Sequence, residues 1–179
     1  MKRVLIVAGT VVVALAACVG LITVLTSRDS SQVNEAAGPG TLEPDHGSGR
    51  VNTGPATPAS PADRPPTSGK HREAHVLKDQ TELSDDQILD ALQSGNVIIT
   101  YEEAKPPAAL VALQRDVQGG PFDPFLSGAG QAVILARRPG AGTQALAWRR
   151  RLIASGPDDP KLRDFADAWL GQAPGYDTG

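Results

Sequence analysis

Two of the three histidines in this 179-residue chain are spaced for metal chemistry. His71, His75 and Asp79 lie at positions i, i+4 and i+8, so a helix would place all three on one face. Two neutral imidazoles and a carboxylate suit zinc or copper. The spacing therefore raises the hypothesis of a metal-handling protein. Since two histidines four residues apart form only a weak motif, we favour a polar segment without a ligand.

Other residues that could carry catalysis lack the neighbours that catalysis needs. Ser68 lies three residues before His71, but no Gly-x-Ser-x-Gly elbow surrounds it. Glu102 and Glu103 are adjacent, so on a strand they would point to opposite faces and form no acid–base pair. The glycines show no P-loop or dinucleotide-binding spacing. We therefore expect a protein that is not an enzyme and needs no cofactor.

Cys18 is the only cysteine, which excludes an intramolecular disulfide. It ends the sequence Leu15-Ala16-Ala17-Cys18, which is similar to a bacterial lipobox, where the cysteine is lipidated after the signal is cleaved. However, the apolar run continues past Cys18 to Leu25, where a lipoprotein would turn polar. Lipidation of Cys18 is therefore kept as an alternative to an uncleaved anchor.

Residues 1–27 predict a transmembrane signal anchor. Residues 4–26 carry no charge and would span roughly 33 Å as a helix, close to the ~30 Å hydrocarbon core. Lys2 and Arg3 precede this run, so the positive-inside rule keeps the N-terminus cytoplasmic and exports the rest. We expect a single-pass cell-membrane protein with two partners, the lipid bilayer through residues 4–26 and a protein of the cell envelope.

Residues 28–64 are rich in Gly, Pro, Ser, Thr and Asp and contain almost no branched apolar side chains. Such a segment cannot bury enough apolar surface to offset the entropy of ordering it. We expect a disordered spacer over 28–64, followed by one folded domain over 65–179.

Residues 65–179 predict an α+β domain with helices packed on a small mixed sheet. A capping box, Ser84-Asp85-Asp86-Gln87, begins a helix that stops at Gly95. In the third predicted strand, alternation would place Leu146, Trp148, Leu152 and Arg150 on the inward side. Hydrophobic periodicity predicts helices over 84–95, 106–117 and 160–172, and strands over 96–102, 131–138 and 143–152.

Arg149-Arg150-Arg151 is the one basic cluster. From Asp79 onward the chain has 14 acidic and nine basic residues, and only 4% of the whole chain is aromatic. An acidic, exported domain of this kind is a poor nucleic-acid binder. We expect no nucleic-acid partner and interpret the arginines as a solvated strand edge.

Five stretches of the chain resemble, in order, the bacterial domain-of-unknown-function family 3105. They are PPTSGKH (65–71), LQSGNVIITY (92–101), VILARRPG (133–140), ALAWRRRL (145–152) and FADAWLGQAP (165–174). Members of that family are typically membrane-anchored and exported, and the resemblance implies that location here. It implies no reaction, so the expected role is a non-catalytic binding or scaffold domain.

The resemblance breaks at the family's most distinctive motif, Val-His-x-Leu-Glu-His-Gly-Gly-Val. The matching residues here are 89–97, where Asp90 and Ser94 replace the two histidines and Gln93 replaces the glutamate. Only the histidine that matches His71 is kept. Asp and Ser are poorer zinc and copper ligands than imidazole, so the resemblance implies that any metal site of the family is lost in this chain.

Overall fold

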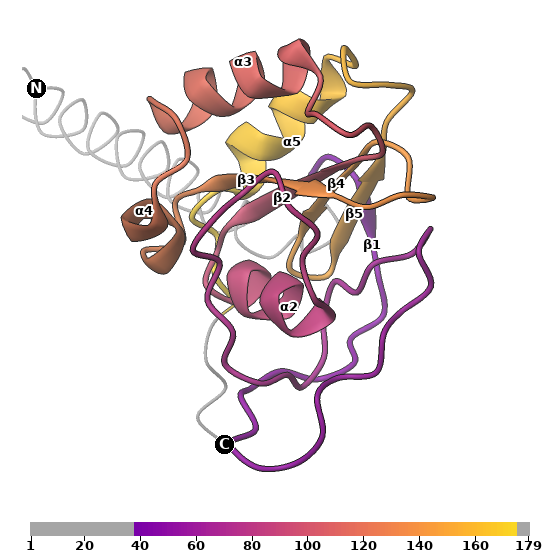
Figure 1. The fold of residues 1–179 in the computed structure, drawn as a ribbon, viewed down its shortest axis with the longest axis vertical. Coiled ribbons are helices and arrows are strands. Elements are labelled where there is room, and N and C mark those ends of the chain that lie inside the picture. The colour runs from indigo at the N-terminus through magenta and orange to yellow at the C-terminus, as the bar shows by residue number, and fades with distance from the viewer. Residues whose placement is uncertain (1–37, 175–179) are drawn as a thin grey trace, which may run out of the picture. The chain divides into compact units, whose positions relative to one another are not determined.

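The computed structural model describes residues 38–174 of the chain (Figure 1). The compact unit begins at Gly38 and is the small α+β domain that the sequence predicts. Its elements are β1 (Thr41–Leu42), α2 (Asp85–Gln93), β2 (Val97–Tyr101), α3 (Ala108–Gln118), α4 (Pro124–Gly128), β3 (Val133–Arg137), β4 (Gln144–Ala147), β5 (Arg150–Ile153) and α5 (Lys161–Trp169).

The predicted anchor over 4–26 and Cys18 lie outside the described residues. Within residues 38–174, no helix is both long enough and apolar enough to cross a membrane.

The five strands form one mixed sheet in the order β1-β5-β4-β2-β3. Strands β2 and β3 run parallel, with Val97 opposite Val133, and the other neighbours pair antiparallel. Helices α3 and α5 cover one face of this sheet and α2 covers the other (Figure 1). Because both faces are covered, β2 is buried along its whole length, which explains its continuous apolar sequence.

The face under α3 and α5 holds the larger apolar cluster, here called the apolar layer. Alternate residues of the central strands meet Leu110 of α3 and Leu162 and Phe165 of α5 there, all fully buried. Helices α3 and α5 agree with the helices predicted over 106–117 and 160–172. Gly40 enters this layer with φ +85°, and a Cβ on it would lie 2.7 Å from the Phe165 ring, so only glycine fits.

The opposite face packs α2 against the sheet. Ile88 and Leu92 of α2 contact Ile98, Ile134 and Leu146 of the strands. The helix starts as predicted, because Ser84 Oγ accepts from Gln87 N and the Gln87 side chain accepts from Ser84 N, which completes the capping box. Gly95, with φ +101°, ends it.

The prediction of a single strand over 143–152 is wrong. It is a β4–β5 hairpin that turns at Trp148 and Arg149, and Arg149, the second central residue of the turn, has a left-handed φ of 57°. The turn reverses the alternation, so Leu146 and Leu152 pack on opposite faces of the sheet instead of one. Arg150 lies inward as predicted, with its guanidinium carbon 4.6 Å from the Trp169 ring centroid.

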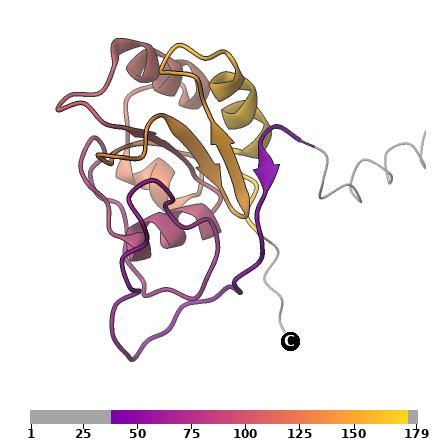
Figure 2. The same ribbon diagram turned by 90° about the vertical axis from the view of Figure 1, so that its right-hand side faces the viewer.

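The prediction of a disordered spacer over 28–64 is corrected for residues 38–64, which pack on the domain (Figure 2). Strand β1 pairs with β5, and Trp169 Nε1 donates to Pro39 O at 2.9 Å. The chain then runs over residues 43–77, here called the strap, without a helix or a named strand. The prediction failed because it counted only apolar residues, whereas the strap is held by polar contacts. Residues 28–37 lie outside the described part.

Candidate functional site

Three carboxylates of α2 hold the strap. Asp85, Asp86 and Asp90 are all buried, although they belong to a helix that begins at the domain surface. Asp85 and Asp86 occupy the first turn, where the helix dipole favours negative charge. We call Asp85, Asp86 and Asp90 the α2 carboxylates.

The first two α2 carboxylates bind the middle of the strap. Ser60 N donates to Asp85 Oδ2 at 2.5 Å, while Thr57 Oγ1 and Arg72 N donate to Asp86 Oδ1 at 2.5 and 3.0 Å. Burial alone would raise the pKa of Asp86, but these hydrogen bonds and the charge of Arg72 lower it below its ordinary value. The charged form of Asp86 is therefore the one that fixes the strap.

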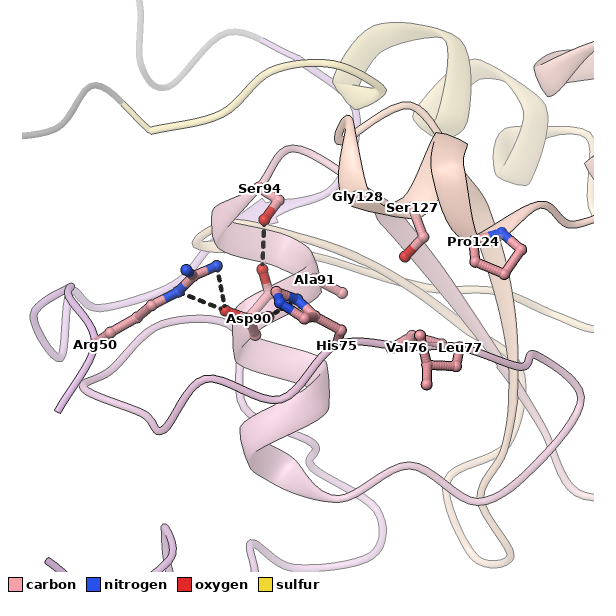
Figure 3. A pocket seen from close by; sticks show the side chains of 10 residues that line it. All are labelled: Arg50, His75, Val76, Leu77, Asp90, Ala91, Ser94, Pro124, Ser127 and Gly128. Carbon is pink, nitrogen blue, oxygen red and sulfur yellow. Dashed lines mark hydrogen bonds and ion pairs between the residues drawn. The ribbon is translucent and has the colours of Figure 1, made fainter. Parts of the chain in front are cut away.

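Asp90 is contacted by three basic side chains of the strap, Arg50, His71 and His75, the first and last of which are drawn in Figure 3. Arg50 Nε and Nη2 both lie 2.8 Å from Asp90 Oδ1. His75 Nδ1 lies 3.2 Å from Oδ2, and His71 Nε2 lies 3.6 Å from Oδ1, which is beyond hydrogen-bond distance. Glu73 Oε1 adds a second carboxylate, 3.0 Å from Arg50 Nη1 and 3.1 Å from His75 Nε2.

These neighbours decide the protonation of Asp90. Its burial would raise its pKa, but the His71 ring and the Arg50 guanidinium stabilise the charged form, and His75 adds to them. The net result is a pKa below the ordinary value. Asp90 is therefore a buried anion surrounded by three basic side chains.

The structure does not assemble the predicted trio of His71, His75 and Asp79. Residues 71–79 form no helix, so the i, i+4, i+8 spacing places the side chains on no common face. His71 and His75 meet at Asp90, whereas Asp79 Oδ2 accepts from Gln114 Nε2 of α3 at 2.7 Å. Within residues 38–174, no group of three His, Cys, Asp or Glu side chains has the arrangement of a metal site.

Asp79 belongs to a separate buried polar group, formed with Gln114 of α3 beside strand β3. Burial raises the pKa of Asp79, and the hydrogen bond from Gln114 opposes that rise in part. The pKa of Tyr101 is also raised, by burial and by the charge of Asp79. Gln114 Nε2 also donates to Val133 O at 2.8 Å, so this group ties α3 to β3.

The remaining sequence candidates have structural contacts. Ser68 Oγ donates to Pro44 O and accepts from His46 N, each at 3.1 Å, so it holds the strap to itself. The arginine cluster is not a solvated edge, because Arg151 is buried. Its Nε and Nη2 form a bidentate salt bridge with the two carboxylate oxygens of Glu43, each at 2.9 Å. Arg151 also donates to Gln144 and Pro65.

An open pocket of about 200 Å³ lies between the strap and the body of the domain (Figure 3). Arg50, His75 and residues 76–77 form the strap side of the pocket. Asp90, Ala91 and Ser94 of α2 and Pro124, Ser127 and Gly128 of α4 form the other side. Leu77, which lines the pocket, is 74% exposed, and Phe125, which follows the lining residue Pro124 in α4, is 88% exposed.

Sequence reasoning missed Arg50, Glu43 and the α2 carboxylates as site residues. Their partners lie 14 to 108 residues away along the chain, so no local spacing could reveal them. One signal was present. Asp90 and Ser94 stand at the positions of the histidines in the resembled motif, and both line the pocket.

A family model described as "Protein of unknown function (DUF3105)" matches residues 55–178. The matched range includes α2 through α5 and the strap from residue 55 onward, so it covers the α2 carboxylates but not Glu43 or Arg50. No curated protein and no solved structure is similar enough to this chain to match it.

Proposed function

Because this chain belongs to the DUF3105 family, whose description names no function, we propose its role from its own residues. It is a single-pass membrane protein that presents the domain outside the cytoplasm as a non-catalytic binding module. The pocket between the strap and α4, with Leu77 exposed in its wall and Phe125 exposed on α4, is the observation that carries this proposal.

The polar groups of the site support binding over catalysis. Asp85 and Asp86 are occupied by strap donors, and Asp90 is neutralised by its basic neighbours. A general base or nucleophile needs a side chain free to meet a substrate. Large exposed apolar side chains beside a pocket are typical of a surface that contacts another macromolecule.

The sequence supports the membrane location. Residues 4–26 carry no charge and follow Lys2 and Arg3, as in a helix with a cytoplasmic N-terminus. If the domain begins at Gly38, the tether over 27–37 reaches at most about 40 Å.

A cysteine-labelling experiment tests the orientation. The background is Cys18→Ser, which removes the one cysteine of the chain. In intact cells, a membrane-impermeant maleimide should label Ala112→Cys on the exposed side of α3 and should label Lys2→Cys only after permeabilisation. The opposite pattern contradicts export of the domain.

The same background separates the two anchors. If residues 4–26 are an uncleaved helix, Cys18→Ser stays in the membrane fraction with its full mass. In the parent chain, loss of residues 1–17 together with a lipidated N-terminal Cys18, both abolished by Cys18→Ser, would instead favour the lipoprotein.

A site-specific cross-linker tests the binding surface. A photoreactive phenylalanine at Phe125 should give a defined higher-mass adduct in native membranes. The same residue at Ala112, exposed on α3, is the matched control and should give none. Equal cross-linking at both positions, or none at either, would contradict a binding surface beside α4.

A further inference from the structure

His71 and His75 share an unusual feature, because each ring faces hydrogen-bond acceptors at both nitrogens. His71 Nδ1 lies 3.1 Å from Gly69 O, and Nε2 points to the Asp90 carboxylate at 3.6 Å. His75 lies between two carboxylates, Asp90 at Nδ1 and Glu73 at Nε2. Neither environment suits a neutral imidazole.

A neutral imidazole has one N–H donor, whereas the protonated ring has two. In the neutral His71 ring that donates to Gly69 O, Nε2 presents a lone pair to Asp90. Within the described part of the chain this nitrogen is buried and makes no hydrogen bond. Protonation converts it into a donor that carries charge toward the carboxylate. The same change gives His75 a donor for each of its carboxylates.

We infer that the strap is a pH-responsive latch over the pocket, closed while His71 and His75 are protonated and looser once they are neutral. The charged groups that face the two rings are Asp90 from α2 and Glu73 and Arg50 from the strap. The β4–β5 turn contributes the uncharged Trp148 ring, 6.5 Å from His71 between centroids. When both imidazoles are neutral, Arg50 is the one cation in this group, and it faces the two carboxylates of Asp90 and Glu73.

The sign of the effect follows from the groups that titrate. The second donor of each ring exists only in the imidazolium form, so its contact is present at lower pH and is lost when the ring becomes neutral as the pH rises. At the acidic end, the contacts are lost when Asp90 becomes protonated. The latch is therefore tightest in mildly acidic solution.

The latch changes the pocket because Arg50 and His75 form part of its wall, while Asp90 stands on the other side. A looser strap moves that wall away from α2. Control of a partner by this movement rests on the proposed function, but the movement itself does not. An extracytoplasmic domain would meet the pH of its surroundings directly.

Hydrogen–deuterium exchange on the full chain in detergent tests the latch. Labelling times at pH 5.5 and 7.5 are scaled for the intrinsic exchange rate, and peptides of α3 and α5 serve as the internal reference. We expect strap peptides over 46–77 to open about three- to tenfold more readily at pH 7.5, since partly exposed ion pairs are weak. Equal opening at both pH values would overturn the inference.

Three variants identify the groups responsible. His75→Gln, at a half-exposed position, should remove part of the pH response, and Asp90→Asn should remove most of it. His46→Gln, an exposed histidine in the same strap, is the matched control and should respond like the parent chain. A full pH response in both His75→Gln and Asp90→Asn would overturn the latch. No partner is needed for this measurement, so failure of the binding proposal would leave its result unchanged.

Discussion

On one face of the sheet, α3 and α5 press Leu110, Leu162 and Phe165 into an apolar layer. On the other face, α2 adds a smaller apolar cluster and then holds the strap with Asp85, Asp86 and Asp90. The first region is built by removing apolar surface from water. The second orders an otherwise spacer-like segment by giving its donors buried acceptors.

The difference shows two ways for a chain to become ordered. Apolar burial contributes roughly 25 cal/mol per Å² and depends little on geometry. Each polar contact contributes only about 1 kcal/mol, but leaving a buried partner unsatisfied costs more than that. Single polar substitutions in the strap should therefore act through the partner that they leave behind.

The largest effect is expected in the apolar layer. Phe165→Ala removes a fully buried ring that also packs against Gly40, so it should lower the free energy of unfolding by about 4 kcal/mol. Phe125→Ala, at 88% exposure, is the matched control and should change it by less than about 0.5 kcal/mol. Urea unfolding of both variants measures the difference, and similar losses in the two would contradict this packing.

The next effect should come from the buried pair that joins the strap to β5. Arg151→Met leaves Glu43 without its two-pronged partner and should cost about 3 kcal/mol of unfolding free energy. Arg115→Met, on the exposed side of α3, controls for loss of an arginine. Thermal unfolding measures both variants. If Arg151→Met unfolds at the parent temperature, the strap is not held as described.

A smaller loss is expected at the start of α2. Ser84→Ala removes the oxygen that accepts from Gln87 N and should lower the free energy of unfolding by about 1 kcal/mol. Because α2 carries the strap carboxylates, exchange of strap amides should also speed up. Faster exchange confined to α3 or α5 would contradict the dependence of the strap on α2.

Acid should affect the strap before the apolar layer. The pKa values of Asp86, Asp90 and Glu43 are all lowered, so their contribution is present above about pH 4 and is lost as the pH falls below it. Between pH 5 and pH 3, strap amides should lose protection while those of α3 keep it. Simultaneous loss in both regions would show that the strap contacts contribute nothing separate.

The sequence predicted the elements with local signals and failed where the signals are distant. The capping box at Ser84, the β-branched run of β2 and the apolar spacing of α5 each lie within one element, and all three were predicted. The β4–β5 turn was missed because Arg149 adopts a positive φ without a glycine to indicate it.

The strap was missed for a different physical reason. Hydrophobic composition measures only one source of order, and the strap has little of it. Contacts such as Arg50 with Asp90 join residues 40 positions apart, and Glu43 with Arg151 joins residues 108 apart. Residues 71–79 form no helix, and it is these contacts between distant residues that bring the site together.

The start of the folded domain tests the account most directly. The full chain is treated with a non-specific protease at pH 6, and the first residue of the resistant fragment is determined by mass spectrometry. Because the strap is packed on α2 and β5, we predict a fragment that begins before Glu43 and keeps residues 43–77 intact. Rapid cleavage between residues 50 and 64, leaving a stable fragment that begins near Pro65, would contradict it.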